Sequence, residues 1–430
     1  MTSIADPDAL AQAIWPRTAR RLDGALTVGG LDVRDLASEF GTPLFVCDEA
    51  DFRARCQDFR VAFGDDLVSY AAGAFCCREV LRWAAQEGLG IAVSTDGELQ
   101  TALSAGLPGR ILTLHGRNKG VAELARAVDA GVGHIVLDSF EEIARLAYLA
   151  ERGNTRQKVL IRAGAAGTCE PGFALTPGEV AEAARRVLGC PELELAGLHS
   201  HAGPQAAGTA PFEQAARLLT GLAVAIRDEH GVEIAELNLG GGFAIACTAQ
   251  DTPADPRLIA RTLTGAVEQG CHDAGLPRPR LTVEPGRAIA GPGTVTLYET
   301  GTVRQVPSGG EARAQVGVDG GMSDNGRTAR CDARYTCVLA SRESTAPPVL
   351  SSVTGRHCES GDIVVRDACL PADLAPGDLL AVAATGAYHR SVAGNDGQVP
   401  RPAVVGVRDG AARVLIRRET IEDLLRLDAG

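Results

Sequence analysis

Three short motifs in the sequence carry residue types that can bind a phosphorylated or carboxylated ligand. The first is NLGGGF at residues 238–243, with Gly240, Gly241 and Gly242 in a row. Glycines let backbone N–H groups approach a phosphate closely. A glycine-rich turn also occurs without any ligand, so the motif alone leaves both interpretations open.

The other two motifs are EPGR at residues 284–287 and HSHAG at residues 199–203. Glu284 could hold a ring nitrogen protonated, and Arg287 could bind a carboxylate through two parallel hydrogen bonds. His201 could stack on a planar ring. A salt bridge in a turn, and one buried beside one exposed histidine, explain the same residues without a ligand.

A β/α rhythm through the first two thirds of the chain must position these motifs. Short apolar, β-branched runs predict strands at residues 67–72, 91–95, 111–115, 134–138, 158–163, 195–201, 236–240 and 281–284. Helical periodicity between them predicts helices at residues 78–87, 97–105, 121–130, 140–152, 177–188, 211–230 and 256–274. Eight strands alternating with helices predict a closed (β/α)8 barrel of the TIM type.

Such a barrel carries its chemistry at the carboxyl ends of its strands. The polar residues that end the predicted strands are Ser94, His115, Asp138, Arg162, His199, His201, Asn238 and Glu284. All three motifs end predicted strands, so we expect them to lie on one face of the barrel.

The rest of the chain predicts an all-β domain. Strand-like runs punctuated by Gly, Pro and Asp fall at residues 295–298, 315–319, 335–339, 362–365, 379–384, 403–407 and 412–417. We therefore expect an N-terminal segment (1–46) that packs with the β-domain, a barrel (47–290) with the cofactor and substrate pocket, and the β-domain (291–430).

Composition excludes several classes of function. The formal net charge is −12 and the pI is near 5.2, which argues against binding nucleic acid or an anionic membrane. No apolar run suggests a signal peptide or membrane span, so we expect a cytoplasmic protein. The twelve cysteines form no C-x-x-C pair, and we expect no metal site.

The motifs occur in an order that resembles the diaminopimelate decarboxylases, pyridoxal-phosphate enzymes that share their fold with alanine racemase and ornithine decarboxylase. Further matching segments are GTPLFV (41–46), GLHSH (197–201), DGGMSDN (319–325), CESGD (358–362), TGAY (385–388) and RRET (417–420). The resemblance covers roughly residues 25 to 425. It implies the same barrel and β-domain.

The resemblance also implies roles for the cofactor-binding residues. His201 would stack on the pyridine ring, and Glu284 would pair with its nitrogen. Gly240, Gly241 and Gly242 would hold the phosphate. The same set of cofactor-binding positions includes Gly73, Gly286, Arg287 and Tyr388, with Tyr388 helping to hold the phosphate.

For an amino-acid-like substrate, the resemblance implies carboxylate binding by Arg287 and Arg327, with Glu359 contributing. Cys358 would donate a proton. Cys358 and Glu359 would reach in from a partner subunit, which implies an obligate homodimer with shared sites.

The sequence departs from this family at the residue that matters most for the cofactor. The family's lysine, which binds pyridoxal phosphate covalently, falls on Gly73 in YAAGAF (70–75). The only lysines are Lys119 and Lys158. Lys119 lies in a loop that the family has while using a different lysine, and Lys158 begins the fifth strand, at the end away from the chemistry. We expect any pyridoxal phosphate to bind noncovalently, or not at all.

Other departures accumulate nearby. Pro204 replaces a serine of the phosphate site, and the loop at residues 163–173 is shortened. After Arg327 a tyrosine is lost, and Arg330 and Cys331 stand in that segment without an assigned role. Asp396 replaces another tyrosine.

Three interpretations remain open. The chain is a diverged, lyase-like enzyme that uses the old pocket for an amino-acid-like substrate, which we favour. Alternatively it is a noncatalytic binding or subunit-partner protein. In the third, it is an ordinary diaminopimelate decarboxylase with an isolated or engineered change at Gly73.

Overall fold

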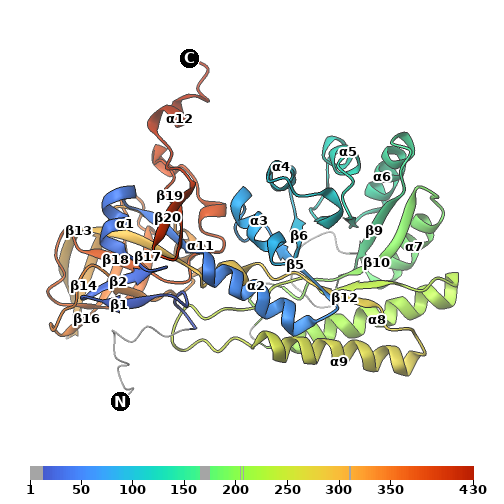
Figure 1. The fold of residues 1–430 in the computed structure, drawn as a ribbon, viewed down its shortest axis with the longest axis horizontal. Helices are drawn as coiled ribbons and strands as arrows, with labels where there is room; N and C mark the ends of the chain where they lie inside the picture. Colours follow the sequence, from blue (N-terminus) through green and yellow to red (C-terminus); the bar gives the residue numbers. More distant parts are fainter. Residues whose placement is uncertain (1–12, 165–174, 204, 207, 309–310) are drawn as a thin grey trace. The chain divides into compact units, whose positions relative to one another are not determined.

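The computed structural model describes residues 13–164, 175–203, 205–206, 208–308 and 311–430. The chain divides into two compact units (Figure 1). The barrel unit comprises residues 55–244 and 253–286. The sheet unit comprises the chain up to residue 54, residues 245–252 and residues 287–430.

Eight strands form the barrel unit's core: β5 (Leu67–Ala71), β6 (Gly90–Val93), β7 (Leu112–Leu114), β8 (His134–Leu137), β9 (Gln157–Arg162), β10 (Leu193–His199), β11 (Glu236–Asn238) and β12 (Arg280–Val283). They close in the order β10-β11-β12-β5-β6-β7-β8-β9, and every neighbouring pair is parallel. This confirms the predicted (β/α)8 barrel.

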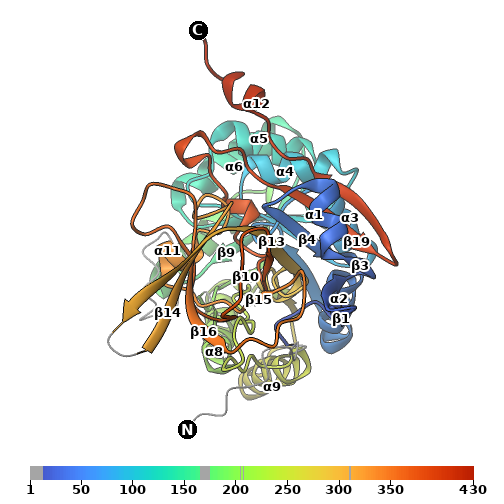
Figure 2. The same cartoon turned by 90° about the vertical axis from the view of Figure 1, so that its left-hand side faces the viewer.

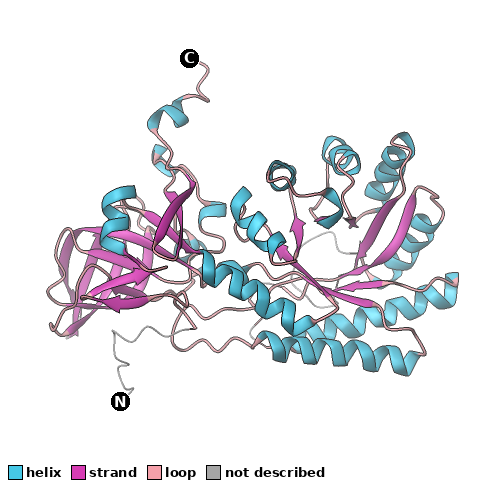
Figure 3. Ribbon diagram, in the orientation of Figure 1, coloured by secondary structure: helices cyan, strands magenta, loops and turns pink. Residues whose placement is uncertain are grey.

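Helices flank these strands (Figure 3). They are α2 (Glu49–Phe63), α3 (Arg78–Gln86), α4 (Asp96–Ser104), the 3₁₀ turn η1 (Gly109–Ile111), α5 (Val121–Asp129), α6 (Phe140–Arg152), α7 (Pro177–Leu188), α8 (Ala210–His230) and α9 (Pro256–Ala274). Hydroxyl side chains cap several of them. Thr95 accepts from the Glu98 N–H at α4, and Thr176 forms a reciprocal capping box with Glu179 at α7.

The sheet unit is built mainly of strands: β1 (Arg20–Leu22), β2 (Ala25–Val28), β3 (Leu31–Asp32), β4 (Leu44–Asp48), β13 (Thr294–Ser308), β14 (Glu311–Val318), β15 (Cys337–Leu339), β16 (Pro348–Thr354), β17 (Ile363–Pro371), β18 (Leu379–Val382), β19 (Ala403–Arg408) and β20 (Ala411–Ile416). Its helical segments are α1 (Val33–Phe40), α10 (Arg287–Ala290), α11 (Arg327–Cys331), η2 (Arg390–Val392), η3 (Asp396–Gln398) and α12 (Ile421–Leu425).

The main sheet runs β17-β16-β14-β13-β4-β19-β20, with β18 pairing both β13 and β15. Figure 2 labels β4, β13, β14, β16 and β19 of this sheet. The N-terminal segment contributes β4, which pairs antiparallel with β13 and parallel with β19. Apolar residues of that segment, including Leu26, Val28 and Leu36, share one core with β13, β18 and β19. This confirms an all-β domain that takes in the N-terminal segment.

No helix in the described ranges is long and apolar enough to cross a membrane.

Candidate functional site

Glu284 is the centre of a buried polar cluster at the carboxyl ends of the barrel strands. His115 Nε2 lies 2.8 Å from Glu284 Oε1, and Asn238 Nδ2 donates to the same oxygen at 2.8 Å. The other oxygen, Oε2, lies 3.8 Å from His199 Nε2, which is beyond normal hydrogen-bond range. His115 and Glu284 directly follow β7 and β12, and Asn238 and His199 end β11 and β10. The barrel therefore brings together residues from four strands.

The charges in this cluster are set by burial and by mutual contacts. Burial lowers the pKa of His199 to about 3, so this imidazole is neutral. Burial by itself would raise the pKa of Glu284, but the charge and hydrogen bond of His115, and then contact with His199, hold it well below the ordinary value. Glu284 is therefore a buried, ionised carboxylate that could accept a hydrogen bond from a protonated ring nitrogen.

The glycine motif after β11 forms a cradle that admits no side chain. A Cβ on Gly241 would lie 2.2 Å from Glu284 O, and one on Gly242 would lie 1.9 Å from Gly203 O. Gly240 has a φ of +65° and donates its N–H to Asn238 Oδ1 at 2.8 Å. The Gly241 N–H reaches His201 Nδ1 at 3.3 Å. The backbone and the His201 ring are thus held close together beside Glu284.

Some buried nitrogen atoms in this cluster make no hydrogen bond with any described residue. In the described part of the chain, both ring nitrogens of buried His199 lack a hydrogen-bond partner. Ligand atoms of His115, His199 and Glu284 also lie within 4.8 Å of one another, a donor set that could hold a metal ion. The Glu284 carboxylate, the His199 nitrogens without partners and the glycine turn together fit a phosphorylated aromatic ring.

Gly73 lies two residues beyond β5, at the same end of the barrel. Its φ is not positive, so its backbone does not require glycine. A Cβ built there would meet only Glu98 Oε1 within 4 Å among the described residues, at 3.5 Å. Position 73 has room for a side chain, unlike the neighbouring Gly286, whose Cβ would lie 2.9 Å from Ala71 O.

Neither lysine lies free at this end of the barrel. Lys119 is almost fully buried, forms an ion pair with Glu142 at 2.8 Å, and donates to Val136 O at 2.7 Å and Gly116 O at 3.0 Å. Two hydrogen bonds and one ion pair therefore hold this ammonium group in place. Lys158 is the second residue of β9, exposed at the amino end of that strand.

The sheet unit groups the predicted arginines around one tyrosine. Arg287 lies over the Tyr388 ring at 4.6 Å, and Arg327 lies 5.9 Å from the same ring. Tyr388 has a φ of +59°, a backbone region that a bulky residue rarely adopts. No acidic side chain within the described ranges pairs with Arg287 or Arg327, and Arg327 Nε is buried without a hydrogen-bond partner.

This pair of cations stands in an environment that disfavours charge. Burial and then the charge of Arg327 lower the pKa of Arg287. Burial lowers the pKa of His389 to about 3 and raises that of Tyr335 to about 12. The neighbours are therefore neutral, and a carboxylate would be the natural partner of the two guanidinium groups.

Cys358 and Glu359 lie on an exposed segment whose base is firmly held. Asp362 accepts from the backbone of Met322 at 2.6 Å and of His357 at 2.7 Å. His357 Nε2 lies 2.8 Å from Ser323 Oγ. Both Cys358 and Glu359 are exposed in the single chain.

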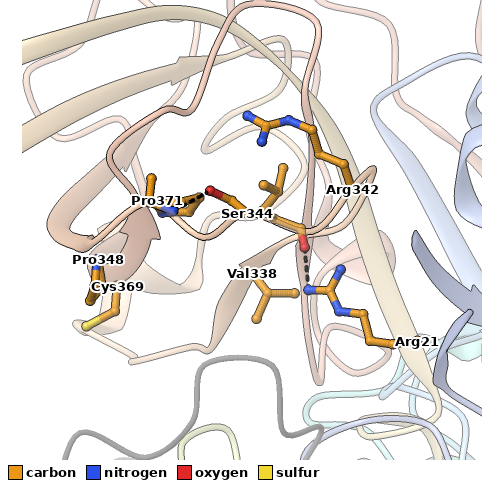
Figure 4. A pocket seen from close by; sticks show the side chains of 9 residues that line it. Arg21, Val338, Arg342, Ser344, Pro348, Cys369 and Pro371 are labelled. Carbon is orange, nitrogen blue, oxygen red and sulfur yellow. Dashed lines mark hydrogen bonds between the residues drawn. The ribbon is translucent and has the colours of Figure 1, made fainter. Parts of the chain in front are cut away.

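Other parts of the prediction lie elsewhere. Pro204 and most of the shortened loop at residues 163–173 fall outside the described residues. Arg330 and Cys331 are exposed at the end of α11. A pocket in the sheet unit (Figure 4) contains none of the predicted site residues and is lined by Arg21, Val338, Leu339, Arg342, Ser344, Ala346, Pro348, Cys369 and Pro371.

Sequence reasoning overlooked Glu98 and the Lys119–Glu142 pair. The pattern T-x-x-E at Thr95–Glu98 signals a helix start but not its proximity to Gly73. His115 and Asn238 were recognised as strand ends, but not as partners of Glu284.

Two family models match the chain. The pyridoxal binding domain of pyridoxal-dependent decarboxylases matches residues 49–291, and the C-terminal sheet domain of the same family matches residues 293–386. Together they match the barrel unit and much of the sheet unit, up to residue 386.

Individual relatives agree with these models. The chain is 47% identical to the diaminopimelate decarboxylase of Mycobacterium tuberculosis, with 97% of this chain and 98% of the relative covered. It is 37% identical to that of Bacillus subtilis, with 94% and 95% covered. The structure of the diaminopimelate decarboxylase from M. jannaschii in co-complex with L-lysine is similar at a TM-score of 0.90 and 25% identity, covering 96% of this chain and 98% of that one.

Proposed function

The chain belongs to the diaminopimelate decarboxylase family of pyridoxal-dependent decarboxylases, and on that premise we propose that it binds pyridoxal phosphate noncovalently and acts on an amino-acid-like carboxylate substrate. The observation that carries this proposal is a contrast at the barrel's strand ends. The residues of the Glu284 cluster and of the glycine cradle are present, whereas Gly73 offers no amine and Lys119 is paired with Glu142.

When bound, pyridoxal phosphate supplies an electron sink for negative charge next to an amino group. Glu284 would hold a proton at the ring nitrogen, and His201 would stack on the ring. The backbone of Gly240, Gly241 and Gly242 would bind the phosphate. Gly286, fixed against Ala71, would keep Glu284 in position.

Carboxylate recognition falls to the sheet unit in this proposal. Arg287 and Arg327 would bind a substrate carboxylate, because both guanidinium groups are buried or half-buried beside Tyr388 and lack an acidic partner among the described residues. We further propose a homodimer in which Cys358, as proton donor, and Glu359 serve the partner subunit. Their exposure in a single chain supports this role.

Absorbance spectra of the purified protein with pyridoxal phosphate test the proposal, beside a Gly73→Lys variant. We expect the native protein to bind the cofactor reversibly and to gain no mass after borohydride reduction. The variant should gain one pyridoxyl phosphate under the same treatment. If the pocket now serves another substrate, the variant should gain the covalent cofactor without gaining diaminopimelate decarboxylation. A gain of about 10²–10⁴-fold in that activity, the contribution of a positioned acid–base group, would instead indicate an ordinary decarboxylase with an isolated change at Gly73.

Ordinary diaminopimelate decarboxylation is the alternative, and 47% identity across almost the whole of both chains supports it better than it supports a diverged activity. Turnover of diaminopimelate by the native protein at the rate of its relatives would establish this candidate and refute noncovalent use of the pocket. A Gly73→Lys variant that gains the covalent cofactor but no activity would instead indicate a different substrate or a binding role.

A further inference from the structure

We propose that the space beside Gly73 is a binding site for the primary ammonium group of a small amine, held by the carboxylate of Glu98. The inference extends the proposed function, since it fills the position from which an amine is missing. It concerns only residues of the barrel unit.

The first support is steric. Gly73 has neither a left-handed backbone nor a crowded Cβ position, and only Glu98 Oε1 lies within 4 Å of that position in the described structure. Glycines nearby are different: Gly116, Gly241 and Gly286 each have an atom within 3.0 Å of the Cβ position. At these three positions glycine avoids a steric clash. At position 73 no clash would occur, so the glycine there leaves open space.

The second support is an unpaired carboxylate facing that space. Glu98 Oε2 accepts from the Ser94 N–H at 2.6 Å, which fixes the side chain at the start of α4. Oε1, the oxygen that faces Gly73, makes no hydrogen bond with any described residue, and no described basic side chain forms an ion pair with Glu98. Burial raises the pKa of Glu98, so a cation beside it would relieve an existing cost.

The chemistry selects a primary ammonium. Such a group brings a positive charge and three hydrogen-bond donors, and charge-assisted hydrogen bonds are the strong ones. The nearby Cys76 thiol, whose pKa burial raises to about 12, stays neutral and adds no competing charge. The amine could come from a free alkylamine or from the amino group of an amino acid.

Isothermal titration of the full chain with n-butylammonium, which has the four carbons and the ammonium group of a lysine side chain, tests the site with and without pyridoxal phosphate. We expect saturable binding and none of the neutral analogue butan-1-ol. Glu98→Gln should weaken binding about tenfold or more, as expected for a charge-assisted hydrogen bond. Gly73→Ala, whose methyl group would make only an ordinary contact with Glu98, should weaken it by filling the space.

The matched control is Glu179→Gln. Glu179 occupies the same third helical position of α7 and also accepts a backbone N–H, but it is exposed. Equal binding in the Glu98→Gln and Glu179→Gln variants, or no saturable binding to the native chain, would overturn the proposal. Failure to bind pyridoxal phosphate alone would count against the proposed function and leave this site standing.

A competition experiment between n-butylammonium and L-lysine identifies the source of the amine. L-Lysine that displaces n-butylammonium, and that also loses affinity in Glu98→Gln, would assign the site to an amino-acid amine. Binding of n-butylammonium without displacement by L-lysine would assign it to a free alkylamine.

Discussion

The barrel unit and the sheet unit each bury a cation, but only the barrel unit neutralises it. Lys119 is paired with Glu142 at 2.8 Å and donates to two carbonyl oxygens. Arg287 packs on Tyr388 with Arg327 close to the same ring, and no described acidic residue pairs with it. A buried charge is costly unless paired. We therefore interpret the Lys119–Glu142 pair as structural, and Arg287 with Arg327 as a candidate binding site for an anion.

The pKa shifts point the same way. Burial raises the pKa of Glu142, and the charge and hydrogen bond of Lys119 oppose that rise. For Arg287, burial lowers the pKa and Arg327 lowers it further. In the barrel unit, Lys119 offsets the cost of burying the Glu142 charge. In the sheet unit, the cost of burying the Arg287 charge would be offset only when a carboxylate binds.

Breaking the barrel pair should have the largest effect on stability. Lys119→Met leaves Glu142 buried without its cation, and removing one partner of a buried ion pair costs about 3–5 kcal/mol. We expect the free energy of unfolding, measured in urea, to fall by that amount.

The double variant Lys119→Met with Glu142→Leu should recover most of this loss, because no charge remains buried. Lys158→Met is the matched control for loss of a lysine. Lys158 is exposed and 3.9 Å from Glu194, so its removal should change stability by less than about 1 kcal/mol. A loss that small in Lys119→Met would mean that the buried pair is not structural.

A buried acid in the sheet unit sharpens the comparison, since it has hydrogen bonds but no ion pair with any described residue. Asp324 accepts from the Tyr298 hydroxyl and from the Gly321 N–H at 2.9 Å. Burial raises its pKa to about 7, and Asp319 and Asp362 add to the rise. The folded state therefore holds a proton that the unfolded chain has released above its ordinary pKa of about 3.9.

Stability should consequently fall as the pH rises from about 4 through about 7, because the native state binds more protons in that window. Asp324→Asn should flatten this fall and raise the free energy of unfolding at pH 8 by about 2 kcal/mol. Urea unfolding of both proteins from pH 4 to pH 8 measures the effect. Parallel pH profiles for the two proteins would show that Asp324 is already ionised in the fold.

The fold was largely predictable because most strands carry their own signal. The barrel strands are short apolar runs buried on both faces, so local composition identifies them. Strand β16 escaped prediction because it begins at Pro348 and contains Ser351 and Ser352. Its state is decided by pairing with β14 and β17, which composition cannot reveal.

In the candidate site, too, residues with a local sequence signal were predictable, whereas those placed by tertiary contacts were not. His201 and Glu284 could be placed at strand ends from the β/α rhythm, and their proposed roles remain predictions. Glu98 could not be placed beside Gly73, since that approach joins the turn after β5 to the start of α4 and leaves no mark in either segment. The β/α pattern of the sequence predicts the elements but not the side-chain contacts between them.

The smallest stability effect should come from the sheet unit's arginine. Arg287→Met keeps an apolar stem against Tyr388 and removes repulsion from Arg327. We expect stability to stay unchanged or to rise by up to about 1 kcal/mol. Binding of diaminopimelate, measured by titration, should weaken about tenfold or more, because a charged hydrogen-bonding partner is lost.

Arg342→Met provides the contrasting variant in the same unit. Arg342 pairs with Asp378 at 2.8 Å, and Asp378 is buried. Removing Arg342 should therefore cost about 1–2 kcal/mol and leave ligand binding unchanged. If Arg287→Met were instead as destabilising as Arg342→Met, with ligand affinity intact, Arg287 would belong with Lys119 among the structural cations. The difference between the two units would then lie in aromatic packing, and the anion site would have to be sought elsewhere.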